Sequence, residues 1–160
     1  MIEQLASNLW VQQSAWLEFN AGIFVSQNQA LLIDPGITPD EVDSIRNFVL
    51  DKGWDIVGIY LTHWHWDHIV GPERIPNVPV YGPPFYEEVF ETEKQDWTLT
   101  ALADWEKDAG ISRKTPFNIP KPDKFFTNNT NPEALEPHRN NIAQAYSEFA
   151  GEAGAEKGGG

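Results

Sequence analysis

Two short apolar segments on either side of an amphipathic helix constrain the fold most strongly. Residues 30–33 form an apolar run that ends at an Asp-Pro-Gly turn, and residues 56–61 are almost continuously apolar. Such runs are typical of strands that are buried on both faces, as in a parallel sheet. A strand, a helix and a strand of these lengths predict a βαβ unit. We therefore expect an α/β fold.

The segment between the two strands carries the start and stop signals of a helix. Thr38 suits the N-cap, Pro39 suits the first helical position, and Glu41 completes a capping box. Apolar residues then recur at helical spacing, and Gly53 suits the C-terminal cap. The sequence therefore predicts one helix between Thr38 and Gly53.

Further elements are expected on both sides of this unit. Strands are predicted at residues 8–13, 21–26 and 78–81. Helices are predicted at residues 85–92, 97–108 and 132–149. Three prolines between residues 116 and 122 indicate an irregular crossing segment.

Composition narrows the class of protein. The chain has 160 residues, no cysteine and a formal net charge of −13. We assign residues 1–127 to one domain, residues 128–150 to a C-terminal helix and residues 151–160 to a disordered tail. The missing cysteine excludes thiolate ligands, and the acidic charge argues against a nucleic-acid partner. No signal peptide or membrane-spanning run is recognisable, so we expect a cytoplasmic protein without membrane contact.

A histidine-rich segment follows the second apolar strand. It contains His63, His65, Asp67 and His68, whose imidazole and carboxylate groups are the ligands that zinc prefers. In an extended segment, His63, His65 and Asp67 would share one face, and His68 would be offset by one residue. That spacing suits two adjacent metal positions. The alternative is an ordinary polar loop without a metal.

Asp34 and His63 both follow a predicted parallel strand. Open α/β sheets place their ligand sites at the C-terminal ends of such strands. Asp34 is therefore a candidate residue of the same site. The alternative is that Asp34 only forms its Asp-Pro-Gly turn.

The pattern H-x-H-x-D-H resembles the metal-binding signature of the metallo-β-lactamase-fold hydrolases. The residues of this motif are similar to those of the glyoxalase II-like branch. The segment Leu-Leu-Ile-Asp-Pro-Gly at residues 31–36 resembles the buried strand of that family, which ends in a structural aspartate. The resemblance implies an αβ/βα sandwich, of which only the N-terminal half is convincingly present. It implies that His63 and His65 hold a first zinc ion and that Asp67 and His68 help to hold a second. It also implies that Asp34 orients residues 63–68, which we call the metal loop.

The resemblance also implies a function. The chain is expected to be a metal-dependent hydrolase that uses a zinc-activated hydroxide on an ester, a thioester or a related bond of a small molecule. Asp67 would orient the nucleophile and accept its proton. The alternatives are a non-catalytic metal-binding or partner-binding domain, and a truncated form of such a hydrolase.

Three further ligands of that family lack a convincing counterpart. A complete two-metal site needs a third histidine on the first metal, a bridging carboxylate and a last histidine on the second metal. His138 is the remaining histidine, but its sequence context predicts a surface helix. We therefore expect an incomplete site with weak or absent turnover, and a homo-oligomer or a second chain that completes it.

Aromatic residues accompany the proposed ligands. Trp64 and Trp66 alternate with the ligand residues. They either pack the loop against the protein or form a hydrophobic lip around the substrate. Phe85 and Tyr86 leave the same two alternatives open.

Overall fold

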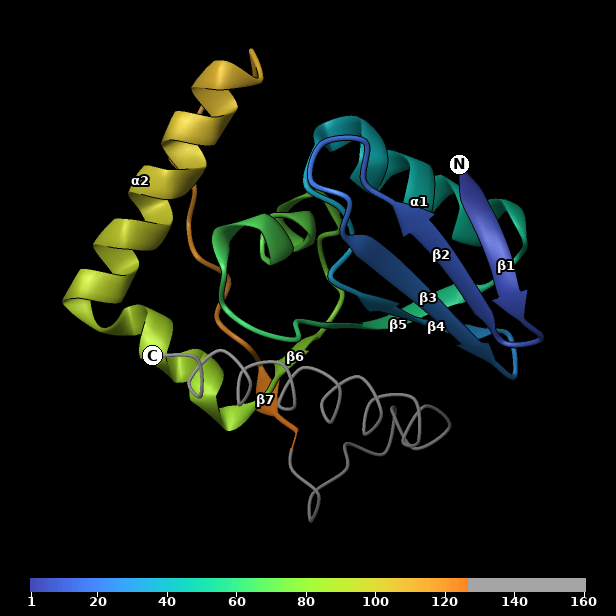
Figure 1. Cartoon of the computed structure of the whole chain (residues 1–160). Helices are drawn as coiled ribbons and strands as arrows, with labels where there is room; N and C mark the ends of the chain where they lie inside the picture. Colours follow the sequence, from blue (N-terminus) through green and yellow to red (C-terminus); the bar gives the residue numbers. More distant parts are fainter. Residues whose placement is uncertain (127–160) are drawn as a thin grey trace, which may run out of the picture.

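The computed structural model describes residues 1–126, which contain one seven-stranded sheet with its strands in sequence order (Figure 1). The strands are β1 (Ile2–Ala6), β2 (Leu9–Gln13), β3 (Asn20–Ser26), β4 (Gln29–Ile33), β5 (Asp55–Tyr60), β6 (Val80–Gly82) and β7 (Lys124–Phe125). Pairing is antiparallel from β1 to β4 and parallel from β4 to β7. The predicted α/β fold and its parallel pair, β4 and β5, are confirmed.

Two α-helices and three 3₁₀ helices accompany the sheet. They are α1 (Pro39–Asp51), η1 (Trp66–His68), η2 (Gly71–Arg74), η3 (Pro84–Phe90) and α2 (Thr92–Asp108). Helix α1 packs on the sheet, whereas α2 contacts η1 and η3 (Figure 1). None of the helices in residues 1–126 is long and apolar enough to cross a membrane.

The start of α1 has the predicted capping box. The Glu41 N–H donates to Thr38 Oγ1 at 3.2 Å, and the Thr38 N–H donates to Glu41 Oε2 at 3.3 Å. The helix ends at Asp51 with Lys52 as its C-cap, and Gly53 follows with a φ of 73°, in the left-handed region that glycine enters without strain. Both ends of the helix therefore lie where the sequence predicts them.

Strand β4 is buried on both faces. Ala30 and Leu32 belong to the core that α1 covers, together with Val42, Ile45 and Val49 of that helix. Leu31 and Ile33 point to a second, smaller cluster on the opposite face. The two-sided burial explains the continuous apolar run of this strand and fixes the position of the residue that follows it.

Some local predictions were wrong. Residues 2–6 form the edge strand β1, which the sequence did not predict because most of its side chains are exposed and do not alternate with apolar ones. Residues 84–90 form the 3₁₀ helix η3 where an α-helix at 85–92 was predicted. Helix α2 begins at Thr92, earlier than predicted.

Other predictions lie outside the described residues. They are the helix at 132–149, the segment 128–150, the tail 151–160 and the domain boundary at 127.

Candidate metal centre

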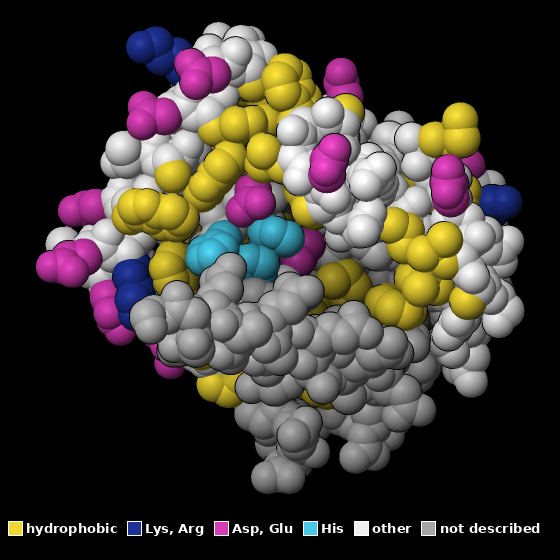
Figure 2. All heavy atoms as spheres, viewed as in Figure 1, with side chains coloured by type: hydrophobic (Ala, Val, Ile, Leu, Met, Phe, Trp, Pro, Cys, Tyr) yellow, Lys and Arg dark blue, Asp and Glu magenta, His cyan; other side chains and the backbone are white. Residues whose placement is uncertain are grey.

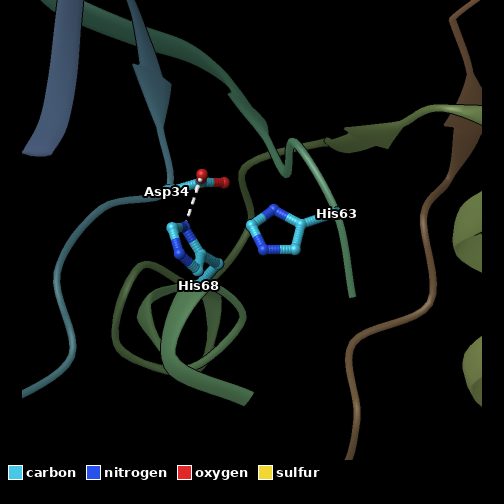
Figure 3. Close-up of side chains that lie close together, drawn as sticks. All are labelled: Asp34, His63 and His68. Carbon is cyan, nitrogen blue, oxygen red and sulfur yellow. Dashed lines mark hydrogen bonds and ion pairs between the residues drawn. The ribbon is translucent and has the colours of Figure 1, made fainter. Parts of the chain in front are cut away.

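The candidate site lies at the C-terminal ends of β4 and β5. Asp34 directly follows β4, and His63 follows β5 after two further residues. Ligand-type atoms of Asp34, His63 and His68 lie within 4.8 Å of one another. Figure 3 shows the two imidazole rings and the carboxylate converging from three separate segments. The parallel pairing of the two strands therefore brings together residues that are about thirty positions apart.

Asp34 connects these segments through its carboxylate. Its Oδ1 accepts a hydrogen bond from the Thr62 N–H at 2.9 Å, and its Oδ2 accepts one from Thr62 Oγ1 at 2.5 Å. Oδ2 also lies 2.8 Å from His68 Nδ1 (Figure 3). Asp34 has a φ of 44°, a left-handed conformation that aspartate tolerates better than most residues. The three contacts suit a residue that orients others, which was the role expected for Asp34.

These hydrogen bonds fix the tautomers of two histidines. Thr62 donates its hydroxyl proton to Asp34, so Thr62 Oγ1 accepts the hydrogen bond from His63 Nδ1 at 2.8 Å. His68 donates its Nδ1–H to the Asp34 carboxylate. In the neutral form of both rings, Nε2 is then the nitrogen that carries the lone pair. Metal-binding histidines usually have this arrangement, in which one ring nitrogen binds the metal and the other forms a hydrogen bond with a neighbouring group.

The two rings differ in electrostatic environment. Burial lowers the pKa of His63 to about 3, and the positive charge of His68 adds to this effect, while Asp34 opposes it. Burial also disfavours charge on His68, but the Asp34 and Asp67 carboxylates outweigh burial and raise the pKa of His68 above its usual value. His63 is therefore neutral at physiological pH, which is the state that binds a metal.

The metal loop is extended only in its first half. Residues 66–68 form η1, in which the His68 N–H donates to the His65 carbonyl at 3.0 Å. The expectation that His63, His65 and Asp67 share one face of an extended segment was therefore wrong. The turn brings His68 back to Asp34 and places its Nε2 3.5 Å from Asp67 Oδ2.

The structure brings His63 and His68 into one group with Asp34, whereas His65 and Asp67 lie beside that group. The ring centroids of His63 and His65 lie 4.6 Å apart, and those of His63 and His68 lie 4.2 Å apart. Asp67 joins them through its contact with His68. The division of these residues between two metal ions stays a prediction. His138 lies outside the described residues.

Sequence reasoning missed two contacts of the site. Thr62 directly precedes the first histidine of the motif, and its hydroxyl links Asp34 to His63, a role that the sequence did not predict. The ring of Phe19, from the loop between β2 and β3, lies 4.8 Å from that of His68. The position of Thr62 beside the first histidine was a usable signal for the first contact. Nothing in the local sequence indicates the second, because it depends on the path of the β2–β3 loop.

Comparison with protein families shows to which family the chain belongs. The model of the metallo-beta-lactamase superfamily matches residues 16–140. This chain belongs to the metallo-beta-lactamase superfamily. The match covers both Asp34 and the metal loop, so the family predicted from the motif is confirmed.

Curated relatives match this superfamily member over a limited region. The hydroxyacylglutathione hydrolase of Buchnera aphidicola subsp. Schizaphis graminum is 42% identical over 57 residues, which cover 33% of this chain and 21% of the relative. That of Wigglesworthia glossinidia brevipalpis is 38% identical over 71 residues, which cover 42% of this chain and 25% of the relative. The matched region thus spans a quarter or less of each relative's length.

A solved structure shows the fold. The crystal structure of DIM-1 metallo-beta-lactamase aligns with a TM-score of 0.50 and 14% sequence identity, and the alignment covers 79% of this chain and 50% of that chain. At this identity the likeness concerns the fold alone. It confirms the metallo-beta-lactamase fold for this superfamily member, which aligns with about half of that chain.

Proposed function

We propose that the chain is a metal-dependent hydrolase that binds zinc through His63, His65, Asp67 and His68. The observation that carries this proposal is the pair of hydrogen bonds at the Nδ1 atoms of His63 and His68. They fix two clustered imidazole rings in one tautomer, with the Nε2 lone pairs of the neutral rings suited to a metal. A nitrogen and carboxylate donor set without thiolates fits zinc.

The residues of the site supply distinct parts of the chemistry. Zinc bound there would act as a Lewis acid and lower the pKa of a water molecule from 15.7 to about 7. Asp67 is partly exposed and lies beside the His68 ring, so its carboxylate can orient a nucleophile and accept a proton. Asp34 holds the His68 ring in place during the reaction.

The reaction class follows from the relatives and from the site. The curated relatives are named hydroxyacylglutathione hydrolases, which supports hydrolysis. We propose an ester, a thioester or a related bond of a small molecule as the substrate, and up to two zinc ions in a complete site. A cytoplasmic location stays part of this proposal.

A zinc titration tests the metal site. Zinc should raise the melting temperature of the full chain, because a ligand that binds only the native state stabilises it. The double substitution His63→Ala and His65→Ala should abolish the shift. His138→Ala, measured in the same way, tests whether that residue is an additional ligand. An undiminished zinc response in the double variant would refute the assignment.

A non-catalytic metal-binding or partner-binding domain is the second candidate. It is favoured by one observation, that histidine occurs in the described residues only at positions 63, 65 and 68. Zinc content by elemental analysis, combined with thioester turnover per zinc, separates the two candidates. The mass of the chain in solution, measured alongside, shows whether a second copy completes the site. Zinc binding without turnover in any assembly state would support the non-catalytic domain.

A further inference from the structure

Four tryptophans connect the metal loop with α2. The Trp64 and Trp97 rings lie 6.1 Å apart in an edge-on arrangement, and the Trp66 and Trp105 rings lie 5.5 Å apart. Trp64 and Trp66 belong to the metal loop, and Trp97 and Trp105 belong to α2. We call these four residues the tryptophan wall.

The wall directly adjoins the candidate metal centre. The ring of His65 lies 5.8 Å from that of Trp97 and 5.1 Å from that of Trp64. The space-filling view shows apolar side chains next to the histidines on the same face of the molecule (Figure 2). A small molecule whose reacting bond lies at the metal centre can therefore also contact this aromatic surface.

Packing accounts for most of the wall but not for Trp97. Trp64 packs partly against the core. Trp97, in contrast, is 49% exposed although its ring lies beside His65. Aromatic side chains beside a few convergent polar groups are the combination that lines small-molecule sites.

Helix α2 is held in place for this role. The Arg113 guanidinium donates to both carboxylate oxygens of Glu106 in α2, at 2.6 and 2.9 Å. It also donates to both oxygens of Glu73 in η2, at 2.7 and 2.6 Å. The shared arginine fixes the end of α2 to the segment that follows the metal loop, so the wall is formed before a ligand arrives.

Charge near the wall disfavours anionic groups. Lys94 lies 6.0 Å from the Trp64 ring, but its ammonium group contacts Glu88 at 2.8 Å and Glu91 at 3.1 Å. These two carboxylates more than balance the single positive charge. The net charge of −13 adds a general repulsion of anions.

We propose that the tryptophan wall binds the acyl group of the substrate and selects uncharged acyl groups with an aromatic ring. This inference rests on the proposed hydrolase function. Trp97 is the main specificity-determining residue, because it combines exposure with contact to a candidate ligand. Aromatic stacking and the burial of apolar area supply the preference.

Binding and turnover of matched thioesters test the inference. The probes are the phenylacetyl, acetyl and succinyl thioesters of N-acetylcysteamine, added to the zinc-supplemented full chain and followed by NMR titration. The phenylacetyl thioester should bind roughly fivefold more tightly than the other two, as expected for one aromatic contact. Trp97→Ala should remove this preference, and Trp97→Phe should retain most of it. Leu50→Ala, at an exposed apolar residue of α1, is the control and should leave the preference unchanged.

The two readouts separate this inference from the proposed function. Selective binding of the phenylacetyl thioester without turnover would support the binding role of the wall and contradict the proposed hydrolase function. Turnover with equal binding of all three thioesters, or with a preference for the succinyl thioester, would overturn the inference. An undiminished preference in Trp97→Ala would also overturn it. The zinc-induced shift in melting temperature, measured for each variant, shows whether Trp97 acts on the thioester or on the metal.

Discussion

Thr62 Oγ1 lies 2.5 Å from Asp34 Oδ2, and this contact joins the C-terminal end of β4 to that of β5. A second hydrogen bond, from the Thr62 N–H to Asp34 Oδ1, fixes the backbone at the same point. The metal loop begins at the next residue. Its starting position is therefore set by the sheet rather than by the loop itself.

Replacing Asp34 should weaken zinc binding. Asp34→Asn keeps the size of the side chain and tolerates the left-handed φ, but it removes the charge that orients His68 and Thr62. We expect zinc affinity to fall roughly 10–100-fold, the scale found for groups that orient metal ligands. Competition with a chelating dye measures this affinity. Asp43→Asn is the matched control, because Asp43 pairs with Arg74 instead. An unchanged zinc affinity in Asp34→Asn would show that Asp34 only forms its turn.

The metal-free protein should show opposite pH effects at His63 and His68. The folded pKa of His63, about 3, lies below its unfolded value, so its contribution to stability is present above pH 6.5 and is lost as the pH falls towards 3. The folded pKa of His68 lies above its unfolded value of about 6.5, so its contribution is present below pH 6.5 and is lost as the pH rises through the folded pKa.

The two histidines can be separated by substitution. Between pH 7 and pH 5, His63→Asn should lose less stability than the wild type, by about 1–2 kcal/mol. His68→Asn should lose more than the wild type over the same range. Urea unfolding in the presence of a chelator measures both differences. Differences of the same sign in the two variants would contradict the electrostatic account.

Gly71 should tolerate no side chain. A Cβ atom at this position would lie 2.7 Å from both the Cγ and the carbonyl oxygen of Pro35, the residue after Asp34. Gly71→Ala should destabilise the fold by about 1–3 kcal/mol through this overlap. Gly53→Ala is the control, because its Cβ would meet nothing within 4 Å and only its positive φ is strained. We expect zinc binding to weaken in Gly71→Ala but not in Gly53→Ala. A zinc titration and urea unfolding of both variants measure these effects.

Glu41 has a second role besides its capping box. Its Oε1 accepts hydrogen bonds from Ser14 Oγ at 2.9 Å and from the Ala15 N–H at 3.0 Å, in the loop that carries Phe19. Glu41→Gln leaves one acceptor oxygen in place of two and should cost about 1–3 kcal/mol of stability. Hydrogen exchange at the Ala15 amide should accelerate. Glu3→Gln on the exposed strand β1 is the control, and equal protection of Ala15 in both variants would contradict this role.

The sequence predicts the centre of the fold because local signals agree there. Thr38, Pro39, Glu41 and Gly53 define the ends of α1, and the apolar runs on either side define a buried parallel pair. The location of the site follows from that pair, since Asp34 and the metal loop come directly after its two strands. These features depend on residues that are close in sequence or on one well-known topology.

The remaining features depend on contacts that local patterns do not encode. The turn at η1 brings His68 to Asp34, a partner 34 residues away. Trp97 meets the metal loop only because α2 packs beside η1 and η3. Strand β1 gains its stability from pairing with β2 instead of from burial, so it has no apolar periodicity to detect.

The change from antiparallel to parallel pairing at β4 has a consequence for protein engineering. Strand β3 runs opposite to β4, so the hairpin loop at residues 14–19 reaches the same edge of the sheet as the metal loop. The hairpin loop contributes none of the proposed ligands. Loops of this kind accept insertions more readily than strands do. Lengthening this loop between Ala15, which Glu41 holds, and Phe19, which contacts His68, therefore offers a way to redesign the surroundings of the site while both contacts are kept.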